Sequence, residues 1–333
     1  MLFNVWVTNA CNFRCKYCYV LEYERNININ MADDILRFIH SNVREEKEVI
    51  INFHGGEPVL NYEIVKYMVG SLDKIFGNRV LYGMTTNGSL LTQEIIEFIA
   101  EKFVYNLSIS LDGTKEINDA NRRFRNGTGT YETVISHFLS LNKIRPDVRV
   151  RMTYNSDTIC ELFNNVRHIV ELGFKNIVAV ADYTDKNWNE LDVDILQVEL
   201  EKIFSLYFHN NQVDINFISD LITKKKGLCN GGKSSLNIDI DGNLYPCTWA
   251  VGNIDFVIGD IYKGIDNRRV QQLHKHSMVI NKDCKGCTLY ECCAGTRCKI
   301  INKIITNDFH QAPIFRCQYN NISYQLQKKY NII

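Results

Sequence analysis

The chain has 333 residues, of which 45% are hydrophobic, and its 38 Lys and Arg residues balance its 38 Asp and Glu residues. This length is typical of a large globular domain with a smaller companion, and the neutral charge gives no reason to expect a nucleic-acid or membrane-surface partner. No apolar run approaches the roughly 18 residues that a membrane span needs, and the first residues lack a secretion signal. We therefore expect a cytoplasmic protein.

Short apolar runs alternate with amphipathic stretches over the first two-thirds of the chain. The apolar runs predict strands at 3–8, 49–54, 80–86, 105–111, 148–154 and 176–181. Apolar residues at helical spacing predict helices near 31–46, 61–77, 92–102, 130–143 and 158–172. This alternation predicts parallel βα units with the chemistry at the carboxyl ends of the strands. Six units are too few for a closed eight-stranded barrel, so we expect an α/β fold with a partial (β/α)6 barrel of the TIM type.

The pattern changes after a long amphipathic stretch at 192–210. Alternating apolar and polar residues around an Asp-Gly pair predict a β-hairpin at 234–247. The following residues are rich in cysteine and have little periodicity until a helical pattern near 318–330, so we expect metal sites to hold this part together. We predict a barrel domain over residues 1–215 and a small cysteine-rich domain over residues 216–333.

Twelve cysteines stand in this chain without a secretion signal. Cytosolic thiols stay reduced, so clustered cysteines point to metal binding or catalysis more than to disulfides. Cys11, Cys15 and Cys18 follow the first predicted strand directly, in the loop where a barrel enzyme keeps its chemistry. Thiolates hold iron–sulfur clusters, and three thiolates on a four-iron cluster would leave one iron open for a substrate. A zinc site completed by His54 or His40 is the alternative.

The sequence resembles the radical S-adenosylmethionine (SAM) family, whose hallmark is this C-x3-C-x2-C loop with an aromatic residue inside it, here Tyr17. "HGGEP" at 54–58, "TTNG" at 85–88 and "SISLDG" at 108–113 end the next three predicted strands in the manner of the family. The resemblance implies an enzyme that binds SAM on a [4Fe–4S] cluster and cleaves it reductively. The resulting 5′-deoxyadenosyl radical would take a hydrogen atom from the substrate. An external electron donor of the flavodoxin or ferredoxin type is also implied.

The resemblance further implies which residues hold SAM. The two glycines of "HGGEP" would let the backbone approach the ligand, and the glutamate of this segment can receive the methionine ammonium group. Ser110 and Arg122 would hold the methionine carboxylate. The SAM-binding residues that we expect are Tyr17, Gly55, Gly56, Glu57, Ser110 and Arg122.

The later cysteines resemble the SPASM extension of this family, which carries two auxiliary [4Fe–4S] clusters in enzymes that modify peptides. By the pattern of the family, four cysteines would fully ligate a distal auxiliary cluster, namely Cys284, Cys287, Cys293 and Cys317. Three others would ligate the auxiliary cluster nearer the active site, namely Cys229, Cys247 and Cys298. The resemblance therefore implies three [4Fe–4S] clusters in all. A pair of zinc sites is the alternative.

Two departures from the family pattern leave these ligand sets open. Four residues separate Cys293 from Cys298 where the family usually has three. Cys292 lies beside Cys293, so either could be the ligand, and the spacing favours Cys293. The nearer cluster has no obvious fourth cysteine, because Ser234 and Ser235 stand where some relatives carry it. An incomplete set could leave an iron open to a substrate thiolate, but Cys292, another kind of ligand or water could equally fill the position.

The leading interpretation is a maturase of a ribosomally made peptide that forms a cross-link, first of all a cysteine thioether. Sulfatase maturation, which makes formylglycine, is less favoured. In that branch an aspartate thought to act as a base stands where this chain has Thr248, and a hydroxyl cannot take the proton as a carboxylate would. Carbon–carbon cross-linking is a further alternative. Outside the enzymes, the alternative is a cysteine-rich zinc protein with a structural role.

The partners that we expect follow from this interpretation. They are a cysteine-containing precursor peptide and a flavodoxin- or ferredoxin-type electron donor. The signature cysteines come so early in the chain that no leader-binding domain fits before them. We therefore expect leader recognition by a separate protein or by the barrel surface, if it occurs at all.

Overall fold

The computed structural model describes residues 1–20, 24–43, 47–210 and 212–333. The chain divides into two compact units. The first unit consists of Met1–Arg14, Cys18–Ile109 and Asn230–His274. The second consists of Cys15–Tyr17, Ser110–Cys229 and Lys275–Ile333. The predicted domain boundary between residues 215 and 216 stays a prediction.

The first unit is built on a mainly parallel sheet with the strand order β11-β10-β1-β3-β4-β5. Its strands are β1 (Leu2–Thr8), β3 (Val49–Gly55), β4 (Val80–Thr86), β5 (Asn106–Ser110), β10 (Ser235–Ile238) and β11 (Leu244–Tyr245). All residues of β1 from the second onward are buried, as expected for a parallel strand covered on both faces. β10 pairs in parallel with β1 and antiparallel with β11, so the predicted hairpin is present and extends this sheet.

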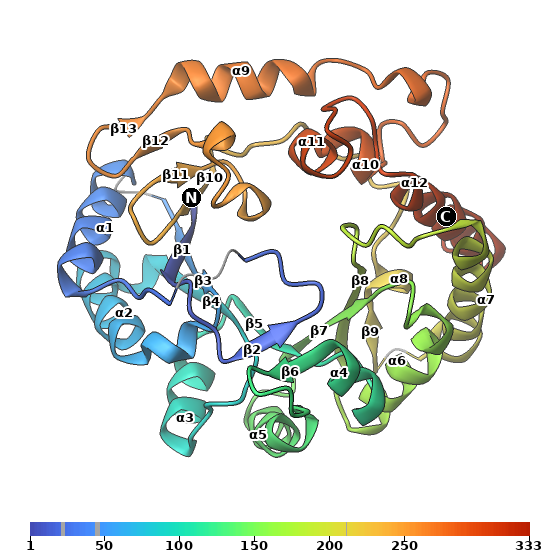
Figure 1. The fold of residues 1–333 in the computed structure, drawn as a ribbon, viewed down its shortest axis with the longest axis horizontal. Helices are drawn as coiled ribbons and strands as arrows, with labels where there is room; N and C mark the ends of the chain where they lie inside the picture. Colours follow the sequence, from blue (N-terminus) through green and yellow to red (C-terminus); the bar gives the residue numbers. More distant parts are fainter. Residues whose placement is uncertain (21–23, 44–46, 211) are drawn as a thin grey trace. The chain divides into compact units, whose positions relative to one another are not determined.

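Helices on the outer side of these strands cover the sheet of the first unit (Figure 1). They are α1 (Ile29–Asn42), α2 (Tyr62–Phe76) and α3 (Gln93–Lys102). Side-chain caps begin two of them, because Asn28 accepts a hydrogen bond from the backbone of Met31 and Thr92 accepts one from Ile95. The predicted helix near 31–46 begins earlier and ends at Asn42, and its expected last residues, 44–46, lie outside the described residues.

The second unit contains a parallel sheet in the order β7-β8-β9. Its strands are β7 (Arg149–Tyr154), β8 (Asn176–Ala181) and β9 (Asp214–Ile215). Its helices before the cysteine-rich part are α4 (Lys115–Asn121), α5 (Tyr131–Ile144), α6 (Leu162–Glu171), α7 (Glu190–Tyr207) and α8 (Asn216–Ser219). Asn189 and Asp192 form a capping box that begins α7.

The cysteine-rich part has more regular structure than the sequence predicted. Its helices are α9 (Asn267–Ser277), α10 (Ala294–Arg297), α11 (Lys299–Thr306) and α12 (Ile314–Lys329). The expected final helix near 318–330 corresponds to α12, which begins earlier. The remaining short strands of the protein are β2 (Phe13–Cys15), β6 (Arg122–Phe124), β12 (Gly259–Asp260) and β13 (Gly264–Ile265).

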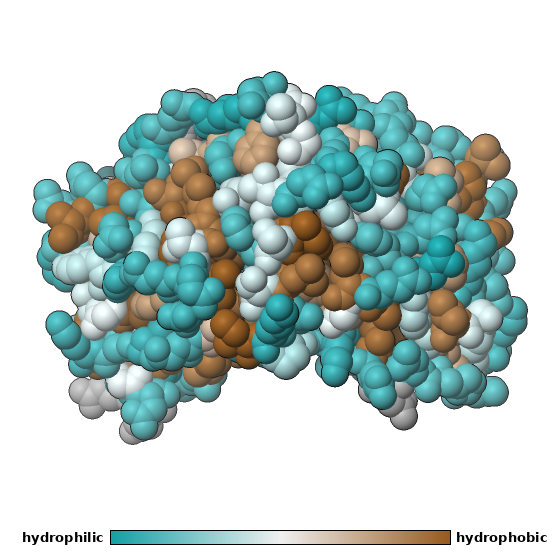
Figure 2. Space-filling model, turned by 90° about the horizontal axis from the view of Figure 1, so that it is seen from below, coloured by the Kyte–Doolittle hydropathy of each residue, from teal (hydrophilic) through white to brown (hydrophobic). Residues whose placement is uncertain are grey.

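Surface composition agrees with the neutral, mixed sequence. Hydrophilic side chains predominate on the face drawn in Figure 2, and apolar ones gather in separate groups between them. Over the part of the chain that the structure describes, no helix is both long enough and apolar enough to cross a membrane.

Candidate active site

The loop after β1 lies directly against the turn after β3. The backbone N–H of Gly56 donates to the Thr8 carbonyl at 3.0 Å, and that of Glu57 donates to the Ala10 carbonyl at 2.9 Å. A Cβ atom at Gly56 would lie 2.2 Å from the Ala10 carbonyl oxygen. At Gly55, where φ is +133°, it would lie 1.9 Å from the Thr8 carbonyl oxygen. Both glycines are therefore required for the close contact of the two loops.

Glu57 joins the end of β3 to the end of β4. Its side chain is 1% exposed. The carboxylate accepts hydrogen bonds from the Asn87 backbone N–H at 2.6 Å, the Thr86 hydroxyl at 2.8 Å and the Val59 backbone N–H at 3.1 Å. Three donors stabilise a carboxylate at such a buried position. Its expected role as acceptor of the methionine ammonium group stays a prediction.

The Cys11 thiol is surrounded by hydrogen-bond donors. Cys11 is 9% exposed, and its sulfur lies 3.8 Å from Asn87 Nδ2 and 3.4 Å from the Phe13 backbone nitrogen. Asn87 also donates to Asn12 Oδ1 at 2.9 Å, which fixes the orientation of its amide. Donors to a ligand sulfur tune the redox potential of an iron–sulfur cluster. Asn87 was missing from the residues expected at the site, although it belongs to the "TTNG" motif.

Tyr17, Asp112 and Arg122 form a hydrogen-bonded group in the second unit, in which Asp112 and Arg122 are buried. The Tyr17 hydroxyl donates to Asp112 Oδ2 at 2.6 Å and accepts a hydrogen bond from the Arg122 guanidinium. Asp112 Oδ1 accepts from the Thr153 backbone N–H at 3.0 Å and lies 3.9 Å from Arg122 Nη1. Tyr17 and Arg122 were expected at the site and are brought together, whereas Asp112 was not assigned a role.

Electrostatics keep the buried Arg122 side chain charged. Burial alone would lower the pKa of Arg122, but its interactions with Cys15, Tyr17 and Asp112 raise that pKa well above its ordinary value. Burial raises the pKa of Asp112, although the Arg122 guanidinium opposes this effect. Arg122 is therefore a protonated guanidinium, which suits the binding of a carboxylate. Ser110, the last residue of β5, is also buried and belongs to the same unit.

The four cysteines expected to ligate the distal cluster lie near one another in the second unit. Burial raises the pKa values of the Cys284 and Cys317 thiols, and the neighbouring thiols of Cys287 and Cys293 raise both further. Among the described residues, no three His, Cys, Asp or Glu side chains are close enough to hold a single metal ion. The role of these four cysteines as ligands of a distal cluster stays a prediction.

Cys292 and Cys293 point in different directions. The Cys292 thiol donates to the Thr223 carbonyl at 3.0 Å. The Cys293 sulfur accepts a hydrogen bond from Asn320 Nδ2 at 3.3 Å, and its proximity raises the pKa values of the Cys284 and Cys317 thiols. The choice of Cys293 over Cys292 as the ligand stays a prediction.

The other two cysteine sets are divided between the units. Cys15 belongs to the second unit, whereas the other two signature cysteines belong to the first. Cys229 and Cys298 belong to the second unit and Cys247 to the first. Their roles as ligands therefore stay predictions. Next to Cys247, the Thr248 hydroxyl donates to Asn237 Oδ1 at 3.0 Å, so this position carries a neutral pair.

Comparison with known proteins identifies the class. Residues 6–154 match the family model of the Radical SAM superfamily. A cysteine-type anaerobic sulfatase-maturating enzyme of Clostridium perfringens (strain 13 / Type A) is 26% identical over 329 residues, covering 88% of this chain and 87% of that protein. The corresponding enzyme of Clostridium novyi (strain NT) is 24% identical over 326 residues, covering 86% and 84%. The chain therefore carries a radical SAM domain. The chain is an enzyme, homologous to anaerobic sulfatase-maturating enzymes.

Solved structures confirm the predicted fold. "Native anSMEcpe with bound AdoMet and Cp18Cys peptide" matches with a TM-score of 0.83 at 20% identity, covering 99% of this chain and 98% of that one. "Streptococcus suis SuiB bound to precursor peptide SuiA" matches with a TM-score of 0.68 at 16% identity, covering 95% and 75%. The mixed α/β fold with a parallel sheet is thus the partial barrel of radical SAM enzymes.

Proposed function

We propose that this chain is a radical SAM maturase of a ribosomally made peptide and that it closes a cross-link, first of all a cysteine thioether. The names of two structural relatives support a peptide substrate, because one was solved with the Cp18Cys peptide and the other with a precursor peptide. A further relative is the radical SAM cyclopropyl synthase TigE of Paramaledivibacter caminithermalis, which is 22% identical over 87% of this chain and 66% of that protein.

The residues present fit SAM and a [4Fe–4S] cluster. Cys11, Cys15 and Cys18 would hold the cluster, and the buried guanidinium of Arg122 would hold the methionine carboxylate. When bound, the two cofactors supply the 5′-deoxyadenosyl radical that takes a hydrogen atom from the peptide. The contribution of the protein itself is to position the reacting groups. Glu57 fixes the turn that lies against the cysteine loop.

Two auxiliary [4Fe–4S] clusters belong to the same proposal. The mutual influence of the four thiols Cys284, Cys287, Cys293 and Cys317 supports the distal cluster. The nearer one would be held by Cys229, Cys247 and Cys298 in a domain that extends from residue 216. These clusters would accept the second electron that leaves the peptide when the new bond closes, and a flavodoxin or ferredoxin would be the external carrier.

One observation carries the choice of a cross-link. At the position after Cys247, the Thr248 hydroxyl donates to the buried Asn237 side chain, so this position lacks the carboxylate base expected of the sulfatase-maturating branch. The sulfatase-maturating relatives favour a second candidate, the oxidation of a cysteine to formylglycine.

High-resolution mass spectrometry of the peptide product distinguishes the two candidates. A short cysteine-containing peptide encoded beside this protein is co-expressed with it under anaerobic conditions. Formation of a thioether removes one hydrogen from sulfur and one from carbon, and the sulfur no longer reacts with iodoacetamide. Formylglycine instead loses the sulfur and gains an aldehyde that a hydrazide captures. Loss of two hydrogens with every thiol still reactive would assign a carbon–carbon bond and overturn the thioether.

A further inference from the structure

Three consecutive apolar side chains lie exposed in the second unit. Met278 is 72% exposed, Val279 47% and Ile280 50%. They occupy the segment after α9, between Lys275 and Lys285, which we call the 275–285 surface. A contiguous apolar group of this kind, flanked by charged residues, is typical of a surface that contacts a partner.

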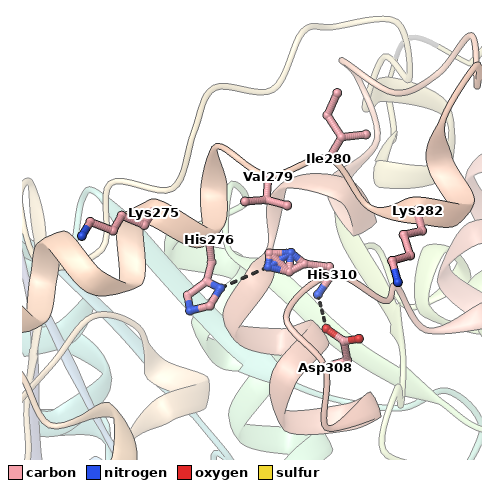
Figure 3. Close-up of a pocket in the computed structure, with 7 residues that line it drawn as sticks. All are labelled: Lys275, His276, Val279, Ile280, Lys282, Asp308 and His310. Atoms are coloured by element: carbon pink, nitrogen blue, oxygen red, sulfur yellow. Dashed lines mark hydrogen bonds between the residues drawn. The ribbon is translucent and has the colours of Figure 1, made fainter.

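A hollow of about 500 Å³ lies in the same surface. Its lining includes Lys275, His276, Val279, Ile280, Lys282 and His310. Figure 3 shows the two imidazoles facing each other, with His276 Nδ1 3.1 Å from His310 Nε2. The His276 ring is stacked on Phe309 with 3.8 Å between the ring centroids, so the pair is held in place.

The charge of this region is positive although the chain is neutral. Residues 275–317 contain seven Lys or Arg and three Asp or Glu residues. The acid that lines the hollow, Asp308, accepts a hydrogen bond from the His310 backbone N–H at 2.8 Å. Lys282 and Lys285 are exposed. The 275–285 surface itself carries three lysines and one acid, Asp283, so charge complementarity favours an acidic partner and opposes a second copy of the same surface.

A short chain of contacts joins this surface to the distal cysteines. The ammonium of the buried Lys299 donates to the Val279 carbonyl at 2.9 Å and to the Asn281 side chain. The Cys284 backbone N–H in turn donates to the Asn281 carbonyl at 3.1 Å. The backbone under the apolar residues is thus fixed beside the cysteines proposed to hold the distal cluster. A partner seated here would lie close to that cluster, which favours an electron carrier.

We propose that the 275–285 surface docks an acidic electron-carrier protein of the flavodoxin or ferredoxin class. This inference rests on the proposed distal cluster. At each encounter the distal cluster, reduced by the electron that leaves the peptide, would pass one electron to the oxidised carrier, so that the cluster is oxidised, the carrier is reduced and no bond or proton changes. Such encounters use small, transient interfaces in which complementary charge sets the rate of association. The lysines and the small apolar group fit this kind of contact.

The test measures binding, with reconstituted protein immobilised and a purified, oxidised flavodoxin as probe in surface plasmon resonance. In the double variant Lys275→Glu/Lys282→Glu, we expect affinity to fall at least tenfold and its dependence on salt to weaken. The matched control is Lys224→Glu/Lys226→Glu, in a basic run elsewhere in the same unit, where affinity should stay within about twofold. Met278→Ser/Ile280→Ser should weaken binding without changing the salt dependence.

Peptide modification by each variant separates this inference from the proposed function. With dithionite as reductant, the Lys275→Glu/Lys282→Glu variant should modify the peptide as the unsubstituted protein does; with reduced flavodoxin it should be slower. Unchanged flavodoxin binding in this variant, or an equal loss in the Lys224→Glu/Lys226→Glu control, overturns the docking surface. Loss of precursor-peptide binding instead would assign the surface to the substrate and overturn the carrier as well.

Discussion

The contact between the cysteine loop and the turn after β3 predicts a large effect of Gly56→Ala. The added Cβ would lie 2.2 Å from the Ala10 carbonyl oxygen, a distance that real Cβ atoms essentially never show, so the two loops must move apart by about 1 Å. That movement breaks the hydrogen bonds that Glu57 and Gly56 donate across the contact, each worth about 1 kcal/mol. With about 1 kcal/mol of residual strain, the free energy of unfolding should fall by about 3 kcal/mol.

Urea unfolding of the cluster-free protein, followed by far-ultraviolet circular dichroism, measures this effect. The matched control is Gly70→Ala. A Cβ at this exposed position in α2 would meet nothing within 4 Å, so the substitution should stabilise the protein by about 0.5–1 kcal/mol. After reconstitution, Gly56→Ala should also retain less iron, because the loop that carries Cys11 is displaced. Equal unfolding midpoints for the two variants would refute the reasoning.

Four further substitutions test the site. Cys15→Ala should abolish reductive cleavage of SAM, and continued 5′-deoxyadenosine formation in a chromatographic assay would contradict the assignment of the first cluster. Arg122→Ala should raise the KM for SAM by the equivalent of about 1.5–3 kcal/mol while leaving the cluster's absorption spectrum unchanged, because a charge-assisted hydrogen bond is lost; an unchanged KM would remove the carboxylate-binding role. Asp112→Asn leaves the buried Arg122 without its carboxylate and should lower the free energy of unfolding by about 3–5 kcal/mol. Urea denaturation measures this loss, and a loss below about 1 kcal/mol would mean that solvent compensates the charge. Cys247→Ala should spare SAM cleavage without peptide but stop product formation in the mass spectrum, and unaffected product would mean that the nearer cluster is dispensable.

Much of the fold could be predicted because its strands are continuous apolar runs. The strand expected at 80–86 has the same bounds as β4, and the one at 176–181 the same as β8. The sequence did not predict helices and strands that lack an apolar pattern or are too short to show one. α9 is a mainly polar helix without a buried stripe long enough to recognise, and β2 and β6 have three residues each.

Site residues could be predicted where the chemistry depends on local spacing. They could not be predicted where the interacting residues come from distant segments of the chain. The cysteine loop could be recognised from three positions within eight residues. Asn87, by contrast, contacts a cysteine 76 positions away, and Asp112 contacts a tyrosine 95 positions away. Neither residue type is unusual in its local sequence, so only the folded chain assigns them a role.

The pairing of β10 with β1 has a consequence for the order of folding. Leu2 pairs with Ser235 and Val5 with Ile238, so one of the first strands to leave the ribosome waits for a partner synthesised more than two hundred residues later. Pairings of such high contact order form slowly, and an apolar strand with an open edge invites association with other chains in the meantime. Nascent chains that stop before residue 235 should therefore aggregate through β1, because the sheet of the first unit is complete only after β10 has been synthesised.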